Sequence, residues 1–105
     1  MTIAELQKAV HALAVEKGWY DNTRTEPELL CLIHSEVSEC LEGIRHGNPP
    51  SDKVPMISQA EEELADVIIR VLDMAAHYGW DMEQAVCIKH GYNTTRAYRH
   101  GGKKY

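Results

Sequence analysis

Hydrophobic residues recur along this chain with the three-to-four-residue spacing of amphipathic α-helices, in four segments that each begin at a capping residue. In each segment a Ser, Thr or Asp is followed three residues later by Glu or Gln, and a glycine stands at the far end. The Pro-rich stretch GNPPSDKVPMIS separates the second segment from the third. The pattern predicts an all-α fold, a four-helix bundle in one domain over 1–105, with helices over 2–18, 25–47, 58–79 and 81–101.

The third segment is apolar over more than half of its circumference, whereas packing against one neighbour needs a stripe about 100° wide. If this helix met only one neighbour, Val67, Val71 or Met74 would be left exposed. A chain this short can best cover such a helix with a second copy of itself. We therefore expect a homodimer or homotetramer built through a helical dimer interface, the alternative being a monomeric bundle with a central helix.

Composition agrees with a small globular domain. The chain has 105 residues, of which 44% are hydrophobic and 26% charged, and no apolar run reaches the roughly 18–20 residues that span a bilayer. The opening MTIAELQKAV lacks the basic start and apolar run of a signal peptide. Cys31, Cys40 and Cys87 form no CxxC pair, so we expect three buried free thiols in a reducing cytoplasm and no membrane partner.

Charge is divided unevenly along the chain. Residues 1–88 hold all 16 acidic side chains and six of the 11 basic ones, whereas no acid follows Lys89. A basic end, with a mobile tail expected over 98–105, is compatible with nucleic-acid binding. The same division can also bring carboxylates and cations together around a small polyanion and its metal ion.

Two pairs of carboxylates carry the clearest candidate chemistry. Glu36 and Glu39 lie three residues apart on the second helix, at the edge of its apolar face (Leu30, Ile33, Val37, Cys40, Leu41 and Ile44), and Glu63 and Asp66 repeat the spacing on the third. Neighbouring antiparallel helices can bring such pairs together, and oxygen ligands alone favour Mg²⁺, with Mn²⁺ as a substitute. The alternative is that both pairs are solvated surface charges.

Two rival metal assignments depend on spacing. A di-iron bundle would need Glu-x-x-His pairs, and the chain contains none. Glu42 follows Glu39 at the same three-residue spacing, so the sequence leaves open whether it is a further ligand.

The fourth helix offers groups that can bind phosphate. Lys89, Asn93 and Arg96 are spaced i, i+4 and i+7, which places them on one face of a continuous helix. The alternative is an ordinary basic face near a helix C-terminus, where cations also interact favourably with the helix dipole.

Taken in order, Glu36-x-x-Glu39, 23 intervening residues, Glu63-x-x-Asp66 and Lys89-x-x-x-Asn93-x-x-Arg96 resemble the MazG-like nucleoside triphosphate pyrophosphohydrolases of the all-α NTP pyrophosphatase superfamily. The segments HSEVSECLEGIR, EELADVIIRVLD and KHGYNTTRAYRHGGKK carry the likeness over residues 29–104.

The resemblance implies that Glu36, Glu39, Glu63 and Asp66 hold Mg²⁺ and that the enzyme cleaves an NTP or dNTP between its α and β phosphoryl groups, as nucleotide-pool housecleaning. Glu36 or Glu39 would activate the water. The resemblance further implies a substrate-binding role for five residues: Lys89, Asn93, Arg96, Trp19 and His11. Lys53, in the Pro-rich loop, can also reach a phosphate.

Two alternatives remain open from the sequence. One is a phosphoribosyl-ATP pyrophosphatase-like enzyme of the same superfamily. The other is a non-catalytic helical module that binds a partner or nucleic acid through the basic end. The pyrophosphohydrolase hypothesis expects a nucleotide substrate and no nucleic-acid partner. If the chain were a non-catalytic module instead, the four carboxylates would be dispensable.

Overall fold

The computed structural model describes residues 1–96; the tail expected over 98–105 lies outside the described residues. The chain forms four helices, α1 (Ile3–Glu16), α2 (Glu26–Arg45), α3 (Gln59–Tyr78) and α4 (Met82–Thr94), and no strand occurs in this part of it. The predicted all-α class is therefore confirmed. No helix among the described residues is both long and apolar enough to cross a membrane.

The four predicted helix starts are confirmed at their capping side chains. Thr2, Thr25, Ser58 and Asp81 each accept a hydrogen bond from the backbone N–H three residues on. In α1 and α3 the glutamate at that position also bonds back to the cap, which completes a capping box. These local bonds fix where each helix begins without help from the rest of the fold.

The end of α4 differs from the prediction of a helix that continues to about Gly101. The structure ends α4 at Thr94, with Thr95 as its C-cap. The hydroxyls of Thr94 and Thr95 donate to the carbonyl oxygens of Gly91 and Tyr92, three residues back, and these bonds compete with continuation of the helix. Arg96 therefore follows the helix instead of sharing a helical face with Lys89 and Asn93.

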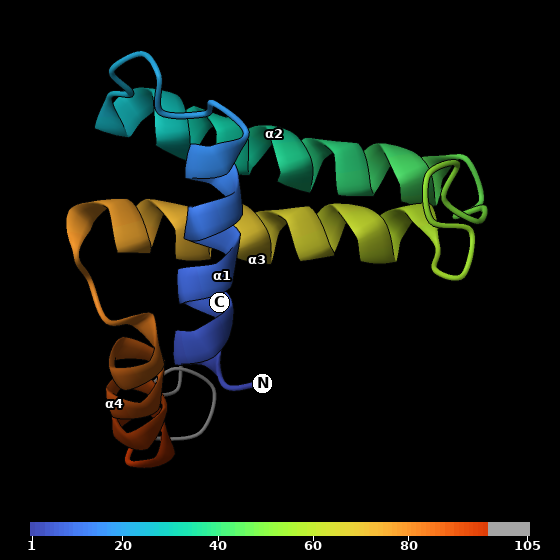
Figure 1. Cartoon of the computed structure of the whole chain (residues 1–105). Coiled ribbons are helices and arrows are strands. Elements are labelled where there is room, and N and C mark those ends of the chain that lie inside the picture. Colours follow the sequence, from blue (N-terminus) through green and yellow to red (C-terminus); the bar gives the residue numbers. More distant parts are fainter. Residues whose placement is uncertain (97–105) are drawn as a thin grey trace.

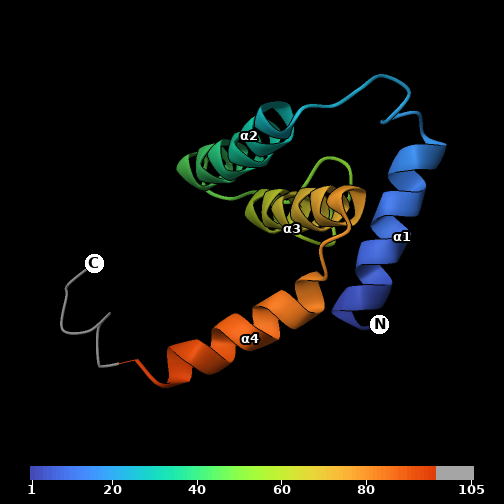
Figure 2. The same ribbon diagram turned by 90° about the vertical axis from the view of Figure 1, so that its left-hand side faces the viewer.

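An antiparallel pair, α2 and α3, forms the centre of the fold, and α1 crosses it at a steep angle (Figure 1). α1 packs against α3 and lies beside that helix, away from α2 (Figure 2). α4 leads away from the pair and has its main contact with α1 (Figures 1 and 2). The four helices thus do not close into a bundle within one chain, because α4 takes no fourth position beside α2 and α3.

The buried apolar core is small, and all of its residues lie on α2 and α3. It consists of Leu29, Cys40, Ala60, Leu72, Met74 and Ala75. The expectation that Val67, Val71 or Met74 is left exposed in a single chain is wrong, because Met74 is buried and Val67 and Val71 are partly buried. The prediction that all three cysteines are buried is also wrong, since Cys31 and Cys87 are exposed and only Cys40 is buried. All three are free thiols.

One face of the central pair stays uncovered by the described chain. It is formed by Leu30, Val37, Leu41 and Ile44 of α2 with Leu64 and Ile68 of α3, each between 48% and 55% exposed. At 100° per residue these side chains fall on the side of α2 and α3 opposite to the one that faces α1. We call these six residues the outer apolar face. Much of the apolar face predicted for the second helix therefore points away from the core.

Candidate functional site

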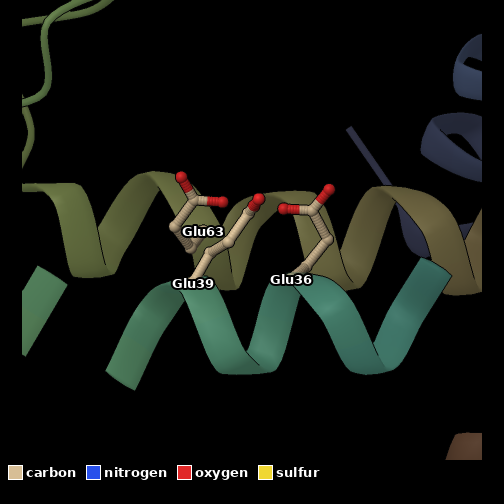
Figure 3. Close-up of side chains that lie close together, drawn as sticks. All are labelled: Glu36, Glu39 and Glu63. Atoms are coloured by element: carbon tan, nitrogen blue, oxygen red, sulfur yellow. The ribbon is translucent and has the colours of Figure 1, made fainter. Parts of the chain in front are cut away.

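Three of the four predicted metal-binding carboxylates converge between α2 and α3. Glu36, Glu39 and Glu63 each offer a carboxylate oxygen, and these oxygens all lie within 4.8 Å of one another. Figure 3 shows the three carboxyl groups pointing toward one another from the two facing helices. We call these three residues the carboxylate cluster.

The close approach of α2 to α3 brings the cluster together. Gly43 faces the start of α3, and a Cβ at this position would lie only 3.0 Å from the Gln59 Cβ. One turn earlier, the Cys40 thiol lies 3.7 Å from the Ala60 carbonyl oxygen. Because small side chains occupy this contact, the helices run close together, and Glu39 and Glu36 face Glu63 across it.

Asp66 belongs to a second group that shares Glu63 with the cluster. Oxygens of Glu62, Glu63 and Asp66 also lie within 4.8 Å of one another. Glu62 accepts a hydrogen bond of 2.5 Å from the hydroxyl of Ser51, which is itself buried. Glu62 was not predicted as a site residue, although it stands directly beside Glu63 and four residues before Asp66.

Glu42, which the sequence left open as a ligand, lies outside both groups. Its carboxylate is exposed and pairs with Arg45 at 3.7 Å and with the ring of His46 at 3.5 Å. It belongs to the solvated end of α2.

A cavity of about 510 Å³ opens beside the cluster, a volume typical of small-molecule sites. Its acidic wall consists of Glu36, Glu39, Glu63, Asp66 and Asp73. α1 supplies Val10, Leu13 and Ala14, and Trp19 follows from the connection to α2. The cavity thus combines carboxylates with an apolar and aromatic wall, and the predicted substrate-binding residue Trp19 belongs to this wall.

Three cations line the same cavity, and each comes from a different segment. They are Lys17 at the end of α1, Lys53 in the loop before α3, and Arg70 within α3. The Ser51 hydroxyl accepts hydrogen bonds from the backbone N–H groups of Lys53 and Val54, which fixes the loop against α3. Arg70 was missed as a site residue, although it stands four residues after Asp66 and hence on the same helical face.

The carboxyl groups of the cluster shift one another's pKa in opposite directions. Burial works to raise the pKa of Glu36, but the neighbouring Glu63 carboxyl and the Arg70 guanidinium outweigh it and hold this pKa below its usual value. The neighbouring Glu36, burial and the nearby Glu39 raise the pKa of Glu63 to about 8. Glu36 also raises the pKa of Glu39, while burial raises that of Asp66. Without a cation, the cluster therefore retains a proton near neutral pH.

One oxygen of Glu36 has no partner. Glu36 is 6% exposed; its Oε1 accepts a hydrogen bond of 2.8 Å from Arg70 Nε, whereas its Oε2 is buried and has no hydrogen-bond partner among residues 1–96. Leaving a carboxylate oxygen buried and unsatisfied costs free energy. A cation held between Glu36 and its neighbours would supply the missing interaction.

His11 lies next to this cavity and is not among its lining residues. Its Nδ1 is 2.8 Å from Asp73 Oδ1, and the Tyr20 hydroxyl donates to Asp73 Oδ2 at 2.6 Å. The Tyr20 ring in turn stacks on His77 at 4.4 Å. These contacts tie the connection that carries Trp19 to α3, so His11 supports the wall of the cavity from behind.

The predicted phosphate-binding residues on α4 and just after it lie away from the cavity and the carboxylate cluster. Lys89 and Asn93 line a separate hollow made entirely of α4 residues. The Lys89 ammonium lies 4.6 Å from the centre of the Tyr92 ring, and Arg96 follows the end of the helix. Within one chain the structure does not bring these three residues to the carboxylate cluster.

Comparison of the chain with protein-family models, with curated proteins and with solved structures gives no match. The site therefore has to be interpreted from its own chemistry. Facing carboxylates, a buried oxygen without a partner and three nearby cations are suited to a divalent cation bound together with an anionic ligand.

Proposed function

We propose that this protein is a Mg²⁺-dependent nucleoside triphosphate pyrophosphohydrolase, acting on NTPs or dNTPs in nucleotide-pool housecleaning. The observation that carries the proposal is the convergence of Glu36, Glu39 and Glu63 around the unpartnered Glu36 Oε2, at a cavity walled by Trp19. Oxygen ligands of this kind fit Mg²⁺, and an aromatic ring fits a nucleobase. The MazG-like motif spacing supports the same assignment.

Glu36, Glu39, Glu63 and Asp66 would hold the metal, which supplies positive charge to the phosphate oxygens. Water adds its oxygen to one of the two phosphorus atoms that flank the α–β bridge. The bond from that phosphorus to the bridging oxygen breaks, and the products are a nucleoside monophosphate and pyrophosphate. The residues' task is therefore to position the reactants and to accept one proton.

Glu39 is the better candidate for accepting the proton of the attacking water. Arg70 already engages Glu36 Oε1, so Glu36 has a single oxygen left for other partners. Among residues 1–96 Glu39 forms no ion pair; it is exposed, lines the cavity, and has a pKa raised above its ordinary value by Glu36. A raised pKa makes a carboxylate a stronger proton acceptor.

A second copy completes the proposed enzyme. The outer apolar face of α2 and α3 is about half exposed and has no covering element in the described chain. Contiguous apolar patches of this kind mark association surfaces, so we propose a homodimer or homotetramer that buries it. Because α4 stands apart from the cluster in its own chain, we propose that Lys89, Asn93 and Arg96 serve the site of a second copy.

The test is a panel of NTPs and dNTPs with Mg²⁺, scored separately for pyrophosphate and for orthophosphate. We expect pyrophosphate release by the natural protein, loss of nearly all turnover in Glu36→Gln, and unchanged turnover in the control Glu42→Gln. Equal turnover in the two variants would refute the assignment of the site. Orthophosphate as the primary product would refute the reaction.

A further inference from the structure

Arg70 is a cation within the acidic wall of the cavity. It lies on α3 four residues after Asp66 and seven after Glu63, so all three side chains share one face of the helix. Its side chain is 28% exposed and lines the cavity together with the carboxylates. Neither the motif spacing nor the proposed reaction gives this residue a role.

Arg70 now neutralises the most deeply buried carboxylate of the cluster. The distance from its Nε to Glu36 Oε1 is 2.8 Å, and the Glu36 side chain is only 8% exposed. A buried carboxylate needs a partner of this kind to remain ionised. In the described part of the chain, this Nε is the only guanidinium atom of Arg70 with a hydrogen-bond partner, and an arginine carries five N–H donors in a planar fork.

Trp19 holds the guanidinium of Arg70 at the cavity wall. The centre of the Trp19 ring lies 5.2 Å from the Arg70 guanidinium carbon and 4.3 Å from that of Arg24. Stacking on an aromatic ring favours a fixed orientation and leaves the edge of the guanidinium available to donate. That edge, with its paired N–H groups, matches the oxygens of a phosphate.

We propose that Arg70 exchanges partners: it pairs with Glu36 while the site holds no cation, and donates to the substrate's phosphates once a divalent cation takes over Glu36. This inference rests on the proposed function. Its physical reason is that Arg70 and a divalent cation compete for one buried carboxylate. When the cation binds Glu36, the Arg70 guanidinium loses its counter-ion. A triphosphate bound in the same cavity supplies phosphate oxygens that can replace the lost carboxylate.

The exchange predicts effects of opposite sign on two ligands. In Arg70→Gln, binding of Mn²⁺ alone should become about three- to tenfold tighter, because a competing positive charge is gone. Binding of an α,β-methylene deoxynucleoside triphosphate with Mg²⁺, which cannot be cleaved at the bridge, should become about ten- to a hundredfold weaker. Calorimetry measures both constants without relying on turnover.

Two further variants test whether the changes in binding have another cause than the exchange. Arg70→Lys keeps a positive charge beside Glu36, so its Mn²⁺ affinity should stay within about twofold of the natural protein while the triphosphate analogue still binds about tenfold more weakly. Arg45→Gln removes an arginine that pairs with Glu42 in solvent, and should change neither constant.

The outcomes separate the two claims. Weaker binding of both ligands in Arg70→Gln would show that Arg70 only supports the structure. Unchanged binding of the analogue in Arg70→Lys would show that the paired N–H groups of the guanidinium do not donate to phosphate; either result overturns the exchange. Should Arg70→Gln fail to fold, the Arg70→Lys result decides. If the natural protein itself binds no Mn²⁺, the proposed function fails instead.

Discussion

Without metal, the Glu63→Gln variant should be more stable than the natural protein. With Mg²⁺ present, the variant should be less stable than the natural protein. Glu63 faces two other carboxylates, and the proximity of Glu36, together with burial, raises its pKa from an ordinary 4.5 to about 8. A carboxyl group whose pKa is higher in the folded protein binds its proton more tightly there. Stability is therefore lost as the pH rises from 4.5 toward 8, while the folded protein retains a proton that the unfolded chain releases.

The size of the effect follows from the same shift. Taken in full, it would correspond to roughly 4–5 kcal/mol of unfolding free energy at pH 8.5. The cluster borders an open cavity, and solvent screening reduces the expected gain in Glu63→Gln to about 1 kcal/mol. For a domain of this size, that gain raises the melting temperature by about 4–8 °C.

The assay is thermal unfolding followed by circular dichroism at pH 8.5, once in EDTA and once in excess Mg²⁺. In EDTA the variant should melt above the natural protein, and the difference should shrink as the pH is lowered toward 5. With Mg²⁺ at about 100 times its Kd, the natural protein should gain about 2.7 kcal/mol and overtake the variant. Glu42→Gln makes the same charge change on the solvated end of α2 and should show no such reversal. A Glu63→Gln variant that is less stable in EDTA at pH 8.5, or a natural protein that does not respond to Mg²⁺, would refute the reasoning.

Three further predictions test other parts of the molecule. Ile68→Lys on the outer apolar face should give a particle near 11.9 kDa by light scattering, whereas the natural protein should be a dimer or larger at micromolar concentration, and a natural protein of monomer mass with full activity would contradict this. Asp73→Asn weakens the bonds to His11 and Tyr20 and should cost about 1–3 kcal/mol in urea unfolding; no loss would show that these bonds do not hold the cavity wall. Arg96→Ala should lower kcat/KM about ten- to a hundredfold, and mixing it with an inactive Glu63→Gln chain should restore part of the activity if α4 serves a second copy; no rescue would contradict that arrangement.

The helix starts could be predicted from the sequence because a cap acts over three residues. Thr2, Thr25, Ser58 and Asp81 each make the bond that their local pattern indicates. The end of α4 was missed because two threonine hydroxyls bond back to the helix before Gly101 is reached. The sequence therefore indicates which local hydrogen bonds are available. It indicates less clearly whether a side-chain bond or the next helical backbone bond forms at a given residue.

The carboxylate cluster could be predicted for a related reason. The spacing of Glu36 with Glu39 and of Glu63 with Asp66 fixes the face of each helix, and only the antiparallel contact had to be supposed. Contacts between distant segments were harder to foresee. The ion pair of Arg70 with Glu36 spans 34 residues of sequence. The position of Arg70 four residues after Asp66 indicates a shared helical face, but it does not indicate which carboxylate Arg70 contacts.

The position of α4 depends on packing that the spacing of its own residues does not describe. Lys89 and Asn93 do share one side of α4, as their spacing predicts. That side nevertheless faces a hollow of its own, because α4 contacts mainly α1 and projects away from α2 and α3 (Figure 2). Exposure of Cys31 and Cys87 was missed for the same reason: an apolar surrounding in sequence does not show whether another helix covers it.

The most direct test of the central claim is the identity of the phosphorus-containing products when the protein meets a deoxynucleoside triphosphate. Phosphorus NMR can follow the reaction in Mg²⁺ and again after EDTA is added. We predict that resonances of the nucleoside monophosphate and of pyrophosphate grow together in Mg²⁺ and stop growing with EDTA. Formation of a nucleoside diphosphate with orthophosphate, or an unchanged triphosphate spectrum in Mg²⁺ across the panel of nucleotides, would contradict the account.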